Sequence, residues 1–128
     1  MNNWGTVHQR LQTISRPVRI VVTTRDRHQS CTRSAIEILT TLTEDTPKLQ
    51  LVVKDGEEPL AITLEAADHR SPVSFWGVPS GFELSALVDA LLVTGSGQTE
   101  FSILPDEVVR LLKSISTPVG TDIYVAPT

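Results

Sequence analysis

Two helical patterns flank a β-branched run in the first third of the chain. Residues 3–15 carry apolar side chains three or four positions apart, as on one face of an amphipathic helix, and these are Trp4, Val7, Leu11 and Ile14. Val18–Thr24 is almost unbroken in apolarity and predicts a central strand covered on both faces. A second helix is predicted to begin near residues 28–32 and to end at the acidic turn of residues 44–47.

Strand and helix patterns alternate over the remaining residues. The predicted strands are Leu49–Val53, the two arms of a β-hairpin over residues 60–76 with Pro72–Trp76 as the second arm, and Asp122–Val125. Helical spacing returns from Ser80 and again after Pro105. Gly95–Gly97 is the predicted end of the first of these two helices.

The order of these elements predicts an α/β fold. Two strands joined through a helix should pair in parallel, whereas the arms of a hairpin pair antiparallel. We therefore expect a mixed four-stranded sheet with helices on both faces, which is the thioredoxin-like arrangement.

Composition excludes several classes of protein. The chain has 128 residues, 40% of them hydrophobic, and a net charge of −4, as expected of a soluble globular domain. It contains no apolar run near the roughly 18 residues that a membrane span needs and no basic leader, which favours the cytoplasm and no membrane partner. Cys31 is the only cysteine, so no internal disulfide is expected, and His8, His28 and His69 lack metal-ligand spacing.

Charge is distributed unevenly along the chain. Residues 1–33 hold six arginines and one acidic residue, while residues 34–128 hold five basic and fourteen acidic residues. A basic segment suggests nucleic acid, but no aromatic residue interleaves with these arginines and no nucleic-acid motif accompanies them. We expect no nucleic-acid partner, and we expect the arginines to pair with acidic residues of the same chain or of a neighbouring domain.

One stretch is similar to a known family. Phe75-Trp76-Gly77-Val78-Pro79-Ser80-Gly81-Phe82-Glu83-Leu84, followed by Leu87-Val88-Asp89-Ala90-Leu91-Leu92, resembles the N-terminal domain of the alkyl hydroperoxide reductase flavoprotein subunit and tandem-thioredoxin protein disulfide oxidoreductases. The resemblance runs from about Leu11 to the end of the chain. It implies two thioredoxin folds in series, of which the first lacks its redox cysteines in the flavoprotein branch.

The resemblance also implies a division of the chain. Residues 1–98 would form a thioredoxin-like domain without a Cys-x-x-Cys pair. Residues 99–128 would form a connecting helix and the first strand of a second thioredoxin-like unit, truncated or vestigial. In relatives the cysteine pair would follow within a few residues of the position of Thr128. FAD and NAD(P)H are expected only in other domains of a longer parent protein, with no cofactor in this chain.

The candidate catalytic residues follow the first strand. Alignment with the family places His28 at the attacking position and Cys31 at the resolving position, so one chain cannot complete a dithiol cycle. Arg27 and Arg33 would favour a Cys31 thiolate that forms a mixed disulfide, whereas the alternative is a small hydrophobic residue without chemistry. His28 acting as a general base for Cys31, oriented by Asp26, would instead indicate a hydrolase.

Two further features complete the candidate site. Thioredoxin-like folds place a cis proline before the third strand, and Pro59 stands at that position here as a candidate substrate-binding residue; a trans proline at a strand start is the alternative. Phe75 and Trp76 are expected to pack the sheet. Gly77, Pro79 and Gly81 lack the spacing of a phosphate-binding loop.

Three functional hypotheses follow. The leading one is a non-catalytic thioredoxin-fold module of a disulfide- and peroxide-reducing system, concerned with cell redox homeostasis. It would contact a second thioredoxin-like domain or a redox partner protein through its sheet edge and the face carrying Trp4 and Val7. The enzyme alternative is a single-cysteine thioredoxin- or glutaredoxin-like oxidoreductase that uses Cys31. The third is a scaffold that forms a homodimer through the sheet edge.

Overall fold

A computed structural model describes residues 4–44, 46–67, 70–96 and 105–124, apart from the side chains of Pro72 and Phe82. Contacts divide the chain into two units, Met1–Gln98 and Thr99–Thr128. Each unit is a body of its own, and the first one holds the sheet and the buried core. Within the described residues, no helix is both long and apolar enough to span a bilayer.

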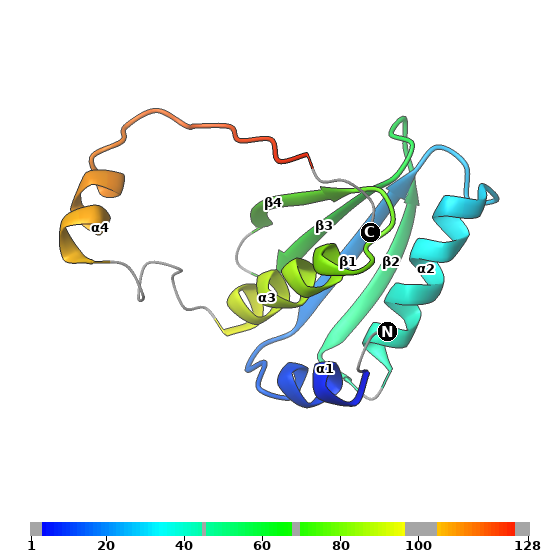
Figure 1. The fold of residues 1–128 in the computed structure, drawn as a ribbon. Coiled ribbons are helices and arrows are strands. Elements are labelled where there is room, and N and C mark those ends of the chain that lie inside the picture. The colour runs from blue at the N-terminus through cyan, green and yellow to red at the C-terminus, as the bar shows by residue number, and fades with distance from the viewer. Residues whose placement is uncertain (1–3, 45, 68–69, 97–104, 125–128) are drawn as a thin grey trace. The chain divides into compact units, whose positions relative to one another are not determined.

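The first unit contains a four-stranded sheet in the order β2-β1-β3-β4 (Figure 1). The strands are β1 (Val18–Thr24), β2 (Leu49–Asp55), β3 (Ala61–Ala66) and β4 (Arg70–Trp76). β1 pairs in parallel with β2 and antiparallel with β3, which pairs antiparallel with β4. The predicted mixed sheet is confirmed, and its first strand matches residue for residue. β4 begins two residues earlier than predicted.

Three helices pack on this sheet, α1 (Trp4–Leu11), α2 (Ser30–Thr43) and α3 (Phe82–Ser96). α1 ends four residues before its predicted end. The amides of Thr13 and Ile14 donate to the carbonyls three residues earlier, at Arg10 and Leu11, so a tighter turn replaces the last part of the helix. That turn keeps Ile14 on the buried side.

α3 ends at Ser96, within the predicted end at Gly95–Gly97, and Gly95 is the last residue but one of the helix. A Cβ atom at this position would lie 2.5 Å from Cγ2 of Ile14. The Gly95 carbonyl accepts from the amides of Ser15 and Arg16, both at 3.1 Å. Glycine is therefore needed where the turn after α1 presses against α3. The glycines with positive φ are Gly77 (103°) and Gly81 (57°), in the turn between β4 and α3.

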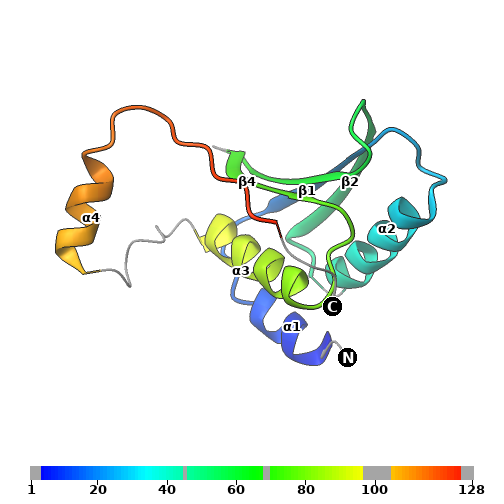
Figure 2. The same cartoon turned by 45° about the horizontal axis from the view of Figure 1, so that its top comes forward.

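Within residues 4–96 the helices lie on one face of the sheet (Figure 2). Ile20 and Val22 of β1 point into the core that the helices cover, whereas Arg19, Val21 and Thr23 alternate to the other face. The expected helix on that second face is not found among the described residues. Residues 56–60, which join β2 to β3, are too few to hold a helix, although the pattern of each predicted helix was read correctly.

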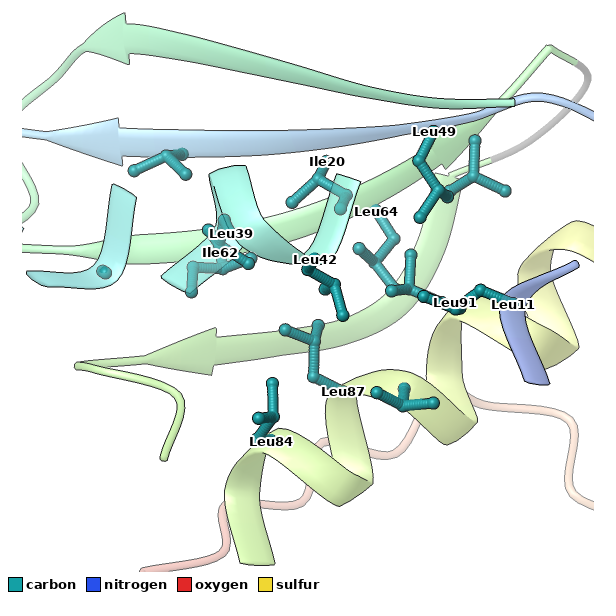
Figure 3. Close-up of a cluster of buried hydrophobic side chains, with 14 of the residues drawn as sticks. Leu11, Ile20, Leu39, Leu42, Leu49, Ile62, Leu64, Leu84, Leu87 and Leu91 are labelled. Atoms are coloured by element: carbon teal, nitrogen blue, oxygen red, sulfur yellow. The ribbon is translucent and has the colours of Figure 1, made fainter. Parts of the chain in front are cut away.

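The core lies between this sheet face and the three helices. Figure 3 shows leucines from the helices gathered against the isoleucines and leucines of the sheet. Buried members include Leu11, Ile20, Leu39, Leu42, Ile62, Leu64, Leu87 and Leu91. Each such side chain contributes roughly 1.5–3 kcal/mol by leaving water, so this cluster is the main source of stability of the first unit.

Aromatic residues are placed differently from the expectation. Trp76 stands opposite Ala61 on the uncovered sheet face and is 61% exposed, so it does not pack the sheet as predicted. Phe75, one position earlier on β4, points to the opposite face and packs against the core, as predicted. Trp4 and Val7 also pack against the core, so the predicted contact surface on α1 is used inside the first unit.

The second unit contains α4 (Asp106–Lys113) and no buried apolar residue among those described. Asp106 and Glu107 lie in its first turn and Arg110 and Lys113 in its last, which suits the helix dipole. The predicted strand at 122–125 is not formed at Asp122–Tyr124, and Val125 lies outside the described residues. Ile123 and Tyr124 are highly exposed, so the described part of this unit has no sheet for them to join.

Candidate functional site

The candidate site lies where β1 ends and α2 begins. β1 ends at Thr24 and α2 begins at Ser30, with Gln29 as an extended cap whose side chain makes no capping hydrogen bond. Cys31 stands in the first turn of α2 and is exposed. Its thiol lies 3.8 Å from Oε1 of Gln29. Cys31 is therefore not part of the buried core.

His28 is held by its backbone. Its amide donates to Oδ1 of Asp26 at 2.9 Å, which closes a local turn of the Asx type. Asp26 thus fixes the loop conformation, and no hydrogen bond found among the described residues joins its carboxylate to the imidazole ring. His28 and Cys31 share the corner, but no such bond links them either. The arrangement offers no support for the hydrolase hypothesis.

The interior of the corner is built around the buried hydroxyl of Thr24. Oγ1 of Thr24 lies 3.0 Å from Oγ1 of Thr32 in α2 and 3.0 Å from the carbonyl of Pro59. It also accepts from the amide of Asp26 at 3.3 Å. One hydroxyl thereby connects the end of β1, the start of α2 and the segment before β3. The buried hydroxyls of Thr24 and Thr32 are thus paired inside the protein.

The connection from β2 to β3 crosses directly over the end of β1. The amide of Gly56 donates to the Thr24 carbonyl at 3.0 Å, and the amide of Arg25 donates to the Glu58 carbonyl at 2.7 Å. A Cβ at Gly56 would lie 2.3 Å from Cγ2 of Thr23, so only glycine allows this approach. These two backbone hydrogen bonds fix the crossing segment to the end of β1.

Pro59 is in the trans form, since the described residues contain no cis peptide bond. The predicted cis proline is therefore corrected. The Pro59 carbonyl points inward and accepts from the hydroxyl of Thr24. Pro59 thus lies beside the end of β1, but its peptide bond is trans and not cis. A substrate-binding groove built on a cis proline beside Cys31 is not present.

Two of the arginines near Cys31, Arg25 and Arg27, bind acceptors of the same chain. Arg25 donates through Nε and Nη2 to the Glu57 carbonyl at 3.0 and 2.9 Å. Arg27 donates through Nε to Oδ1 of Asp55 at 2.9 Å. These exposed pairs each contribute about 0–1 kcal/mol, but together they fasten one loop to the other. Of the arginines in the basic start of the chain, Arg10, Arg19 and Arg27 form ion pairs with acidic residues of the same chain.

Sequence reasoning identified Cys31, His28 and Pro59 and missed Thr24, Thr32 and Gly56. Thr24 and Thr32 lie eight positions apart, one at a strand end and one in the first turn of a helix, and only the fold brings their hydroxyls together. The sequence offered one indication of this role: Thr24 is a polar residue at the end of a mainly apolar strand. In the described part of the chain, which omits His69, no group of three His, Cys, Asp or Glu side chains is placed to hold a metal.

Comparisons with known proteins find the same architecture. No family model and no curated protein matches the chain. The NTD_N/C domain of alkylhydroperoxide reductase AhpF from Enterococcus faecalis matches with a TM-score of 0.69 and 18% identity, over 84% of this chain and 56% of that one. A protein disulfide oxidoreductase from Aeropyrum pernix matches with a TM-score of 0.65 and 17% identity, over 87% of this chain and 53% of that one.

The chain therefore spans little more than half the length of these solved relatives. At such identities the match concerns the fold. It agrees with the element order, the mixed sheet and the resemblance noted in the stretch from Phe75 to Leu92. The chain has a thioredoxin-like fold, similar to that of the AhpF N-terminal domain and of the archaeal protein disulfide oxidoreductase.

Proposed function

We propose that this chain is a non-catalytic thioredoxin-fold module of a disulfide- or peroxide-reducing system. Its role is to pack against a redox partner, and it does not exchange disulfides itself. The observation that carries the proposal is the closed corner at the end of β1. There the hydroxyl of Thr24 ties α2 to the Pro59 segment, so the Pro59 carbonyl is bonded inside the protein.

The chemistry of thiol exchange supports the same assignment. Resolution of a mixed disulfide needs a second thiol, and Cys31 is the only cysteine in the sequence. His28 occupies the position where the family has its attacking cysteine. The trans form of Pro59 removes the backbone geometry that the fold uses to hold an incoming peptide.

The partner in this proposal is a second thioredoxin-like domain or a separate redox protein. The exposed Trp76, on the sheet face opposite the helices, supports a contact role, because large exposed aromatic residues are enriched at interfaces. FAD and NAD(P)H belong to other domains of a longer parent protein. The proposal places the chain in the cytoplasm, where a lone thiol needs no oxidising compartment.

One observation favours a second candidate, a single-cysteine oxidoreductase. The Cys31 thiol is exposed in the first turn of α2, where helix amides point toward it. Such a thiol is accessible to glutathione or to a partner thiol. This candidate differs from the first because it requires the fold to accelerate thiol-disulfide exchange at Cys31.

The deciding experiment compares wild type with Cys31→Ser in dithiothreitol-driven reduction of insulin and in de-glutathionylation of a peptide. We expect both proteins to match the buffer rate. Alkylation of native Cys31 at pH 7 should proceed within about threefold of the rate in denaturant, because the thiol is exposed and contacts only Gln29. Equal thermal midpoints would show that both variants are folded. Catalysis by wild type that is absent in Cys31→Ser would overturn the proposal in favour of the oxidoreductase.

A further inference from the structure

The sheet face opposite the helices, called the second face below, carries no helix from residues 4–96 (Figure 2). Its side chains stand in three rows, each of which crosses the strands in the order β2-β1-β3-β4. The first row is Gln50, Arg19, Glu65 and Arg70, the second is Val52, Val21, Thr63 and Ser74, and the third is Lys54, Thr23, Ala61 and Trp76. Short side chains thus fill the centre of this face, while charged side chains and Trp76 lie at its ends.

Neither edge of the sheet favours pairing with the strand of another molecule. On β2, Arg27 donates through Nη2 to the Val53 carbonyl at 3.3 Å, so one acceptor of this edge strand is occupied. On β4, Pro72 has no amide hydrogen, and the register against β3 shifts between Thr63 and Glu65. An added strand would meet an interrupted ladder on both sides. The edges therefore direct association of this unit to the second face.

A two-fold axis parallel to the strands, between β1 and β3, makes the second face complementary to itself. This axis places β1 over β3 of another copy and β2 over β4, and it keeps each row over the same row. Arg19 of one copy then lies over Glu65 of the other, in both directions, and these side chains are 51% and 31% exposed. Lys54 and Trp76 face each other in the same reciprocal way, as a cation and an indole ring. In the centre, short side chains face short ones.

The other two-fold axis between two such faces is perpendicular to the strands, and it gives a poorer match. It places each strand over its own equivalent and the first row over the third. Arg19 would lie over Thr23, and Glu65 would lie over Ala61, so the carboxylate would lose water above an apolar group. The charges of the second face therefore favour the axis that is parallel to the strands.

We infer that the second face binds the same face of a second copy of this chain, with Arg19 against Glu65 in both directions. Strands about 4.8 Å apart that rise about 3.3 Å per residue give this face roughly 400 Å² in each copy. Even doubled, this area is below the roughly 1,200 Å² that stable complexes bury, so the dimer is weak and reversible. The inference goes beyond the proposed function and does not depend on it. A redox partner that contacts Trp76 would compete with the second copy for this face.

The test uses two full-length variants, Arg19→Glu and Glu65→Arg, which each place like charges at both positions. Across the proposed axis each variant repels another copy of itself, whereas one copy of each variant restores both opposite-charge contacts. Arg33→Glu and Glu37→Arg are the matched control pair, because these exposed residues of α2 undergo the same charge changes away from the second face. Sedimentation equilibrium from about 10 μM to 1 mM, the range of a weak contact, measures the mass of each protein alone and of each equimolar mixture.

We expect the wild-type mass to rise with concentration toward that of a dimer, and each face variant alone to associate at least about tenfold more weakly. The mixture of Arg19→Glu with Glu65→Arg should associate within about threefold of wild type, because the facing charges are again opposite. An ion pair within one chain cannot produce this rescue, since neither variant contains the opposite pair. The control variants should associate like wild type, both alone and mixed.

Thermal midpoints near that of wild type are expected for all variants, because the substituted charges are exposed or half-buried. A wild type that stays monomeric at every concentration would overturn the inference. So would a face mixture that associates no better than its two components, or a control mixture that gains as much as the face mixture. The readout is mass, so such a failure is distinct from the outcome of the redox test at Cys31.

Discussion

Gly95 and Ile14 are 81 positions apart in sequence and in closest contact in the fold. Sequence patterns drew attention to both residues, but they did not predict that the two are in contact. Ile14 was assigned to a helix face by its spacing, and it is buried although the helix ends before it. The stretch Gly95–Gly97 predicts the end of α3, and the helix ends there, at Ser96. The steric need for glycine at position 95 was not predictable, because no local pattern reveals a close approach between distant segments.

Substituting Gly95→Ala should therefore lower the free energy of unfolding. The added Cβ would lie 2.5 Å from Cγ2 and 3.0 Å from Cγ1 of Ile14, so the turn after α1 must move. We expect a loss of about 1–3 kcal/mol, as for overpacked cores, in spite of the better helix propensity of alanine. Denaturant unfolding measures it.

Gly120→Ala is the matched control for this prediction. No atom lies within 4 Å of a Cβ at Gly120, so the same substitution should leave the unfolding midpoint unchanged. A stabilised or neutral Gly95→Ala variant would show that the contact with Ile14 relaxes without cost.

At the candidate site, the sequence predicted which residues lie at the corner after β1, but it did not predict the hydrogen bonds that hold this corner together. Cys31, His28 and Pro59 all lie at one corner, as the resemblance implied. The corner is held together by a hydroxyl that no motif contains, that of Thr24, and by a loop whose path follows from the strand order. Such relations require the register of β1 against β3, which hydrophobic periodicity alone does not determine.

Strand β2 is an edge of the sheet, and its outer side is partly covered by a side chain. The amide of Val18 donates to Lys48, and that of Gly56 donates to Thr24, so even-numbered positions of β2 bond to β1. Odd-numbered positions point their backbone groups outward. Arg27 donates through Nη2 to the Val53 carbonyl at 3.3 Å and through Nε to Asp55. An arginine from the adjacent loop thus occupies an acceptor that another strand would otherwise use.

Replacing Arg27→Ala should increase self-association through this edge. The apparent mass in sedimentation should rise with concentration, while the free energy of unfolding changes by no more than about 1 kcal/mol because the ion pair is exposed.

Arg33→Ala, on exposed α2 surface, removes the same charge and should stay at the wild-type mass. Equal masses for the two variants at every concentration would contradict a protective role of Arg27.

Helices and strands were predicted well because each has its own hydrophobic periodicity. The sheet face on which each helix packs was not predicted correctly. Only five residues connect β2 to β3, so no helix crosses to the second face. The same connection explains why Trp76 is exposed, since nothing among residues 4–96 covers its side of the sheet with a helix. The order of helices and strands determines the sheet topology, and the short connection between β2 and β3 leaves the second face of the sheet without a helix from residues 4–96.

At the scale of the whole molecule, the two units differ in the source of their order. The first has a continuous core of side chains from each of its helices and from its sheet. The second has an eight-residue helix with no buried residue. Isolated helices shorter than about 12 residues are marginal in water, so α4 has little intrinsic stability of its own.

Amide hydrogen exchange should show this difference directly. We expect the amides of α4 to exchange at least roughly 100-fold faster than those in the middle of α3, because α4 opens without disrupting any buried contact. The two helices are compared within one sample, so each experiment holds its own reference. Equal protection in α4 and α3 would mean that α4 is already covered in the isolated chain.

The position of β1 inside the sheet has a consequence for how the chain is made on the ribosome. β1 bonds on both edges, and its partners β2 and β3 lie later in the sequence. Leu49 follows Thr24 by 25 positions, which at about 5–20 residues per second takes roughly 1–5 s. Throughout that interval an apolar strand with two free edges is exposed in each nascent chain, and the newly made protein depends on dilution or on chaperones for its solubility.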